Sequence, residues 1–121
     1  MKTRSAKAKG RRLQNRIVQM LSEAFPQWHP DDIRPAIMGE SGADIKLSPA
    51  AQQQCPWAIE AKNQERVNLW KAYAQAEAHA REKSNTEPIL VVSKNHIKEP
   101  LAVVRFSYLI RLLVALHEKN I

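Results

Sequence analysis

The sequence is poor in cysteine and glycine and contains no long apolar run. Its 121 residues include one cysteine and three glycines. A single thiol excludes an internal disulfide and a zinc site built from several thiolates. No apolar segment approaches the roughly 20 residues that span a bilayer, and the basic start lacks the apolar core of a secretory signal. We therefore expect a cytoplasmic protein; an origin in a phage or prophage is compatible with this assignment.

The sequence also lacks the glycine-rich loops that bind nucleotide phosphates, which argues against nucleotide-driven chemistry. What it does contain is typical of a soluble globular protein, with 44% hydrophobic and 26% charged residues. A chain of this length can bury one modest core, so we expect a single domain.

Positive charge is concentrated at the start of the chain. The first 16 residues carry seven lysines and arginines and no acid, which equals the whole formal net charge of +7. A cationic segment on a neutral body favours a polyanion partner, because Lys and Arg release counterions from a phosphate backbone. A solubilising tail and an arm that binds acidic lipid are the alternatives. We interpret residues 1–9 as a flexible basic arm on a domain of residues 10–121, and we expect phosphate contacts from Lys7, Lys9, Arg11, Arg12 and Arg16.

Hydrophobic periodicity predicts an α/β protein with the order α-β-β-β-α-β-β-α. A helical period begins at Gly10 and ends before Pro26. A short strand is expected at 36–39, and alternating strands at 43–48 and 57–62 predict an antiparallel hairpin joined by a polar turn. The later elements are a helix at 65–83, strands at 87–95 and 101–107, and a helix at 108–120. We expect a central mixed sheet covered by helices on both faces.

The last predicted helix, "YLIRLLVALHEKN", is apolar nearly all the way round. Such a helix is either sandwiched in the core or forms half of a subunit contact. The sequence leaves both possibilities open.

Two strands of the predicted hairpin carry an acid and a lysine two residues apart. They are Asp44 with Lys46, and Glu60 with Lys62. The two-residue period places each acid on the same face as its lysine, and the strand register decides whether the two acids meet. Two adjacent carboxylates repel one another, and a hard divalent cation relieves that repulsion. The alternative is a solvated outer face on which carboxylates pair with lysines.

With these residues in place, the chain resembles the PD-(D/E)xK nuclease superfamily, and most of all the archaeal-type Holliday junction resolvases. The resemblance covers roughly residues 8–95 in order and spacing, with few identical positions. The segment "AKGRRLQ" is similar to the start of the resolvases' first helix, and Asp44, Glu60 and Lys62 fall on the Asp and Glu-x-Lys of their hairpin. The resemblance implies a restriction-endonuclease-like core, so that residues 10–121 would form one nuclease-like domain.

The resemblance also implies a mechanism and partners. Asp44, Glu60 and the Ala61 carbonyl would bind Mg²⁺ or Mn²⁺, and Lys62 would orient the attacking water or stabilise charge on the phosphate. The protein would be a metal-dependent DNA endonuclease, selective for branched or junction DNA and homodimeric. Where the resolvases carry a Glu in the first helix, this chain has Gln14; Glu40 could supply that carboxylate, and Gln75 could point towards the phosphate. A DNA-binding protein that keeps the nuclease fold without activity is the alternative.

The remaining polar and aromatic residues give no second constellation. The four histidines show no metal-ligand spacing, and we interpret them as surface or loop residues. Trp57 and Trp70 could stack on exposed bases, but core filling explains both better.

Overall fold

Three strands form the central sheet of the computed structural model, which describes residues 2–120, with side chains from Arg4 onward. They are β3 (Trp57–Asn63), β4 (Glu87–Ser93) and β5 (Leu101–Val103), in the order β3-β4-β5. β3 and β4 are parallel, with Ile59 opposite Ile89, whereas β4 and β5 are antiparallel. The parallel pair is connected by helix α3 (Leu69–Arg81), as a parallel crossover requires. The predicted α/β class with a mixed sheet is confirmed.

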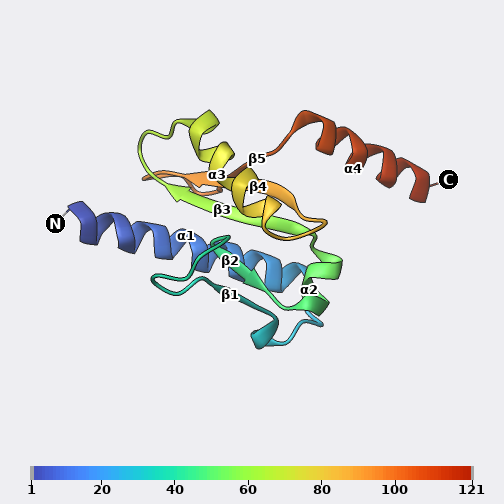
Figure 1. Cartoon of the computed structure of the whole chain (residues 1–121), viewed down its shortest axis with the longest axis horizontal. Coiled ribbons are helices and arrows are strands. Elements are labelled where there is room, and N and C mark those ends of the chain that lie inside the picture. Colours follow the sequence, from blue (N-terminus) through green and yellow to red (C-terminus); the bar gives the residue numbers. More distant parts are fainter. Residues whose placement is uncertain (1, 121) are drawn as a thin grey trace.

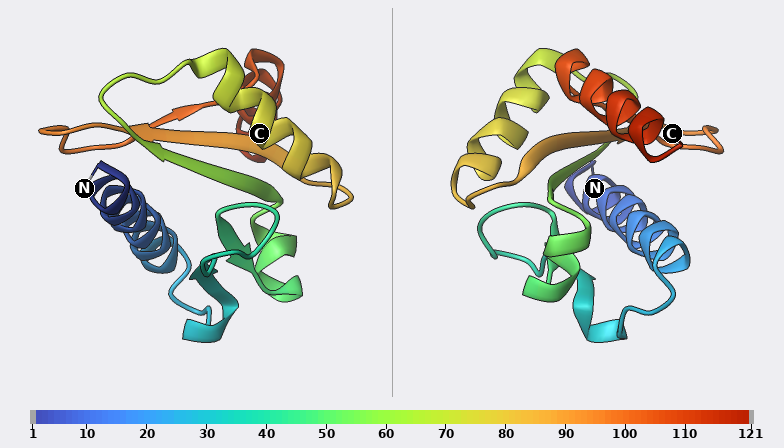
Figure 2. Two further views of the ribbon diagram at one scale, coloured as in Figure 1. Left: turned by 60° about the vertical axis from the view of Figure 1, so that its left-hand side comes forward. Right: turned by 90° about the vertical axis from the view of Figure 1, so that its right-hand side faces the viewer.

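Helices cover both faces of this sheet (Figure 1). The long helix α1 (Lys2–Ala24) lies on one face, together with a small antiparallel sheet of β1 (Ile33–Pro35) and β2 (Ile45–Leu47). Helix α3 lies on the other face, and Figure 2 shows the sheet edge-on between the two helices. A 3-10 turn (Pro30–Asp32), helix α2 (Pro49–Gln54) and helix α4 (Phe106–Lys119) complete the chain.

The core lies between α1 and the sheet. Leu13 and Ile17, four residues apart on α1, are buried against Ile59 and Ile89. Fully burying an aliphatic side chain of this size contributes roughly 1.5–3 kcal/mol, so these contacts fix α1 to the sheet. Because strand side chains alternate, the residues of β3 that flank Ile59 face α3 instead.

Helix α3 meets the sheet through small side chains. Ala72, Ala76 and Ala80 follow one another at four-residue spacing, and all three are buried. A helix with alanine along its contact face lies close to the strand beneath it, since no long side chain holds the two apart. This close approach positions the residues of α3 over β3.

Several predicted element boundaries are wrong. Helix α1 begins at Lys2, so the predicted arm residues form its first turns, which contain good helix formers and no proline. The strand expected at 36–39 lies earlier, at Ile33–Pro35. The polar segment expected as a turn contains α2, because Ser48 accepts a hydrogen bond from the Ala51 amide as an N-cap and Pro49 follows at the first helical position.

The predicted antiparallel hairpin is also wrong. β2 pairs with β1, and β3 pairs with β4, so the two acid-bearing segments belong to different sheets. Helix α2 occupies most of the link between them and replaces the tight turn that a hairpin needs. What remains of the pairing is a backbone hydrogen bond from the Asp44 amide to the Ile59 carbonyl, at 3.0 Å.

The predicted last helix is present as α4 but begins at Phe106, so the strand expected at 101–107 ends at Val103. Helix α4 stands away from the body of the molecule (Figure 1). No side chain of α4 is buried within Phe106–Lys119, all of which the structure describes, so a position inside the core is wrong. A hydrogen bond between the Trp57 indole and the Tyr108 hydroxyl ties the start of α4 to β3. Trp70 is 88% exposed on α3, so core filling is wrong for this tryptophan.

No helix within residues 2–120 combines the length and the apolar character needed to cross a membrane.

Candidate active site

Asp44 is held at the free edge of β3. Its amide donates to the Ile59 carbonyl at 3.0 Å, and its Oδ2 accepts from the Ala61 amide at 2.8 Å. β4 occupies the opposite edge of β3. The side chain of Asp44 therefore binds an edge amide of β3 that a neighbouring strand would otherwise bind. The two residues that Asp44 contacts, Ile59 and Ala61, lie on either side of Glu60 along the strand.

Glu60 lies between these two contacts, in the middle of β3. Its side chain points towards α3, and the residue is only 4% exposed. An acid is rarely buried to this extent without a partner. The partner here is His79 of α3, whose Nδ1 lies 2.6 Å from Glu60 Oε1.

Burial and the neighbouring charge of Asp44 both act on the Glu60 carboxyl. Burial raises the pKa of Glu60 above its ordinary value, and the nearby charge of Asp44 raises it further. The hydrogen bond from His79 and the charge of Lys62 oppose this rise. The structure thus brings Asp44, Glu60 and Lys62 into one electrostatic cluster, although the strand pairing that was expected to do so is absent.

Lys62 opens onto a hollow beside α3. It is half-buried and shares a cavity of about 260 Å³ with Lys71 and Gln75. Gln75 thus lies on the same hollow as the predicted catalytic lysine. The strand period places Lys62 on the same face of β3 as Glu60.

Asp44 opens onto a second hollow, of about 400 Å³, between α1 and the loop after β1. Gln14 and Glu40, the two accessory candidates, line it as well. Both Glu40 oxygens are engaged by the Arg34 guanidinium, at 2.8 and 2.9 Å. Arg34 and the Ile37 amide lower the pKa of Glu40 to about 2, so this carboxylate is ionised but already paired.

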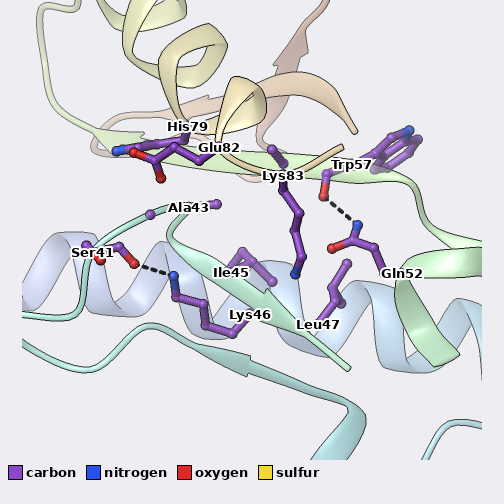
Figure 3. A pocket seen from close by; sticks show the side chains of 12 residues that line it. Ser41, Ala43, Ile45, Lys46, Leu47, Gln52, Trp57, His79, Glu82 and Lys83 are labelled. Carbon is purple, nitrogen blue, oxygen red and sulfur yellow. Dashed lines mark hydrogen bonds between the residues drawn. The ribbon is translucent and has the colours of Figure 1, made fainter. Parts of the chain in front are cut away.

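A third hollow, of about 260 Å³, lies between β2 and the end of α3 (Figure 3). Lys46 of β2 lines one side and donates to the Ser41 carbonyl, whereas His79 and Glu82 line the opposite side. Lys46 therefore does not join the cluster around Glu60, in contrast to Lys62.

The predicted DNA-binding residues divide between the two flanks of α1. Lys7 and Arg11, four residues apart, line the hollow of Asp44. Arg12 and Arg16 are exposed and lie on the opposite flank by the helical period. Lys9 is mostly covered and forms an ion pair with Glu65 at 3.6 Å. Only Lys7 and Arg11 of this set adjoin the carboxylate cluster.

The cluster suits a hard cation in its donor chemistry. Among residues 2–120, no three His, Cys, Asp or Glu side chains are arranged to hold a metal ion, so any site here needs a backbone ligand. The Ala61 amide faces Asp44 at the free edge, and the carbonyl of a strand residue points to the same side as its amide. Two mutually repelling carboxylates and this carbonyl match the oxygen ligands that Mg²⁺ or Mn²⁺ takes.

His79 is the site residue that sequence reasoning missed. The sequence pattern predicts a surface or loop histidine here, whereas the His79 side chain is 29% exposed and contacts Glu60. Its position on α3, next to the alanines that face the sheet, indicates that His79 lies close to β3. The helical pattern alone does not show which strand residue a helix side chain meets.

Comparisons with protein-family models, with curated proteins and with solved structures found no match to this chain.

Replacing Glu60 by Gln should stabilise the metal-free protein at pH 8. A carboxyl whose pKa is raised by folding binds its proton more tightly in the folded state, so folding stability falls as pH rises through the folded-state pKa. Gln removes this buried charge but can still accept the hydrogen bond from His79. We expect a gain on the order of 1 kcal/mol at pH 8 that fades towards pH 4.

Urea unfolding in EDTA at both pH values measures this gain, with Glu118→Gln on exposed α4 as the control. An E60Q variant that is less stable than wild type at pH 8 would show that the Glu60 charge is well compensated without a metal.

Proposed function

We propose that this protein is a metal-dependent DNA endonuclease that hydrolyses phosphodiester bonds, with branched or junction DNA as its substrate. The observation that carries the proposal is the pair of carboxylates at the free edge of β3. Asp44 brackets the buried Glu60 through hydrogen bonds to Ile59 and Ala61. A charged Glu60 buried beside Asp44 disfavours folding, which favours a function for this carboxylate.

The Mg²⁺ or Mn²⁺ ion would be held by Asp44, Glu60 and the Ala61 carbonyl. When bound, such an ion supplies an acidified water and polarises the scissile phosphate. Lys62 contributes a positive charge on the same face of β3 as Glu60, beside the hollow that Gln75 also lines. Its ammonium would hold the attacking water or stabilise charge that develops on the phosphate.

The order of elements supports a restriction-endonuclease-like core. Helix α1, three strands, helix α3 and the buried strand β4 occur in the same order as in the nucleases that the sequence resembles, with helix α2 inserted between β2 and β3. The chain departs from that pattern because β1 and β2 form a separate sheet. The Asp44–Ile59 hydrogen bond keeps the acid-bearing segments in contact despite this separation.

DNA would approach along the flank of α1 that carries Lys7 and Arg11, since this flank adjoins Asp44. Lys62 and Lys71 continue the positive surface beyond the cluster. The exposed Trp70 on the same helix as Lys71 offers a ring on which an unpaired base can stack. These groups recognise backbone and unpaired bases, which suits a branched substrate.

One observation favours the non-catalytic alternative. The resolvases' helix carboxylate is replaced by Gln14, and Glu40, which could stand in for it, is bound on both oxygens by Arg34. A protein that has lost one ligand in this way could still hold DNA through its basic helix.

A second copy of the chain would cover α4. Its exposed apolar residues include Phe106, at 74%, and Leu113, at 65%. A nearly apolar groove of about 400 Å³ runs between α4, the sheet and the second half of α1. Because the groove and the helix lie on one chain, two copies related by a two-fold axis can bury both at once.

Replacing Glu60 by Ala should abolish Mg²⁺-dependent cleavage and leave DNA binding intact or slightly tighter, because a negative charge near phosphate is removed. We expect a loss of at least about 10²-fold in rate. Labelled four-way junction, flap and duplex DNA should be tested in parallel, with Glu118→Ala as the control. Cleavage by E60A at nearly the wild-type rate would exclude Glu60 as a metal ligand. Wild-type binding without any cleavage would favour the non-catalytic alternative.

The double variant Lys7→Ala, Arg11→Ala should weaken DNA binding more than Arg12→Ala, Arg16→Ala, which removes the same charge from the opposite flank. Each phosphate contact contributes about −0.9 to the slope of log affinity against log salt on duplex DNA. We expect the slope to become shallower by about 2 for K7A/R11A and to change little for R12A/R16A. Equal changes for the two pairs would show that α1 attracts DNA by net charge alone.

Light scattering at low micromolar concentration should give twice the mass of one chain. Leu113→Glu should shift the protein to a monomer that still folds, because Leu113 is exposed within one chain. A wild-type monomer, with and without DNA, would contradict the two-fold arrangement.

A further inference from the structure

We propose that His79 is a positioning residue for Glu60: its imidazole holds Oε1 of the carboxylate and leaves Oε2 free for the metal ion. This inference rests on the proposed nuclease function and adds to it a residue from outside the Asp and Glu-x-Lys pattern.

The contact has the geometry of a strong, specific hydrogen bond. His79 Nδ1 lies 2.6 Å from Glu60 Oε1, and the Glu60 side chain is 5% exposed. An ionised carboxylate only accepts hydrogen bonds, so Nδ1 carries the hydrogen when Glu60 is ready to bind a cation. Among the residues that the structure describes, the hydrogen bonds to this carboxylate involve Oε1 alone.

The position of His79 is fixed by the packing of α3. Ala76 and Ala80, on either side of it along the helix, are both buried against the sheet. The end of α3 is closed by Thr86, whose hydroxyl lies 3.0 Å from the Ala80 carbonyl and 2.9 Å from the Lys83 carbonyl. A site residue on such a rigid element holds its partner more precisely than one on a loop.

Neighbouring charges act on the Glu60 carboxylate in opposite directions, so a fixed partner is needed to hold its orientation. Lys62 shares its face of β3 and attracts it, whereas Asp44 repels it. A glutamate side chain has three rotatable bonds, and fixing one oxygen removes most of its remaining freedom. Hydrogen bonds of this kind orient metal ligands, and their loss typically weakens metal binding 10–100-fold.

His79 also separates Glu60 from the neighbouring hollow. It lines the cavity of Figure 3, opposite Lys46, whereas Glu60 does not line that cavity. The imidazole thus both binds the carboxylate and covers it on the side away from Lys62.

The test is Mn²⁺ binding to the full-length protein, measured by calorimetry without DNA. Three variants distinguish a hydrogen bond to Glu60 from a packing contact. His79→Ala removes the hydrogen-bond donor. His79→Asn places an amide nitrogen near the position of Nδ1, and His79→Gln places that nitrogen one bond further from the backbone. We expect the Kd for Mn²⁺ to rise 10–100-fold in H79A, to be largely restored in H79N and to stay high in H79Q. His96→Ala, exposed in the loop between β4 and β5, is the matched control.

Cleavage gives a second readout. The Mg²⁺ concentration for half-maximal cleavage should rise in H79A by a similar factor, while the rate at saturating Mg²⁺ stays near that of wild type. The unfolding temperature in EDTA shows whether each variant folds; if H79A does not, the comparison of H79N with H79Q decides.

An unchanged Kd in folded H79A would overturn the inference. A lower Kd in H79A would also overturn it, since His79 would then compete with the metal ion for Glu60. An H79N variant that binds Mn²⁺ no more tightly than H79Q would overturn it as well. In each of these cases wild-type Mn²⁺ binding and cleavage leave the proposed nuclease function standing. Wild-type protein that binds no Mn²⁺ would instead overturn both.

Discussion

Glu60 occupies the centre of β3, where its carboxylate is removed from water and lies close to the charge of Asp44. This is an unfavourable place for an acid, and most of the local structure is arranged around it. Asp44 forms hydrogen bonds with the strand residues on either side of Glu60, and His79 of α3 binds the Glu60 carboxylate. Lys62 balances part of the charge two residues along the strand. An apolar residue at position 60 would pack under α3 more easily, so the buried acid points to a use that packing does not explain.

The two helices on either side of the sheet contribute in different ways. Leu13 and Ile17 anchor α1 in the core, which leaves Lys7 and Arg11 beside the hollow of Asp44. The alanines of α3 bring that helix down onto β3. The fold therefore places positive charge on one side of the carboxylates and a hydrogen-bonding imidazole on the other.

Local patterns predicted most of the elements. Alternation located β3, a short β-branched apolar run located β4, and helical patterns located α3 and α4. They did not predict how the strands pair, since β2 has an apolar face that suits either β1 or β3. The polar segment after β2 is predicted as a turn, but it forms helix α2, with Ser48 as the N-cap and Pro49 at the first helical position. The acid-x-Lys spacing singled out Asp44, Glu60 and Lys62, and the resemblance supplied their expected roles. His79 depends on how α3 packs on the sheet, which no local pattern specifies.

The position of a bound Mn²⁺ ion tests the central claim most directly. Crystals of the wild-type protein grown with MnCl₂, measured near the manganese absorption edge, would locate the ion by its anomalous scattering. The account predicts a peak in contact with the carboxylates of Asp44 and Glu60 and the carbonyl of Ala61, and its absence from crystals of Glu60→Gln. A peak elsewhere on the chain, or an unchanged peak in E60Q, would show that the buried carboxylate does not serve a metal ion.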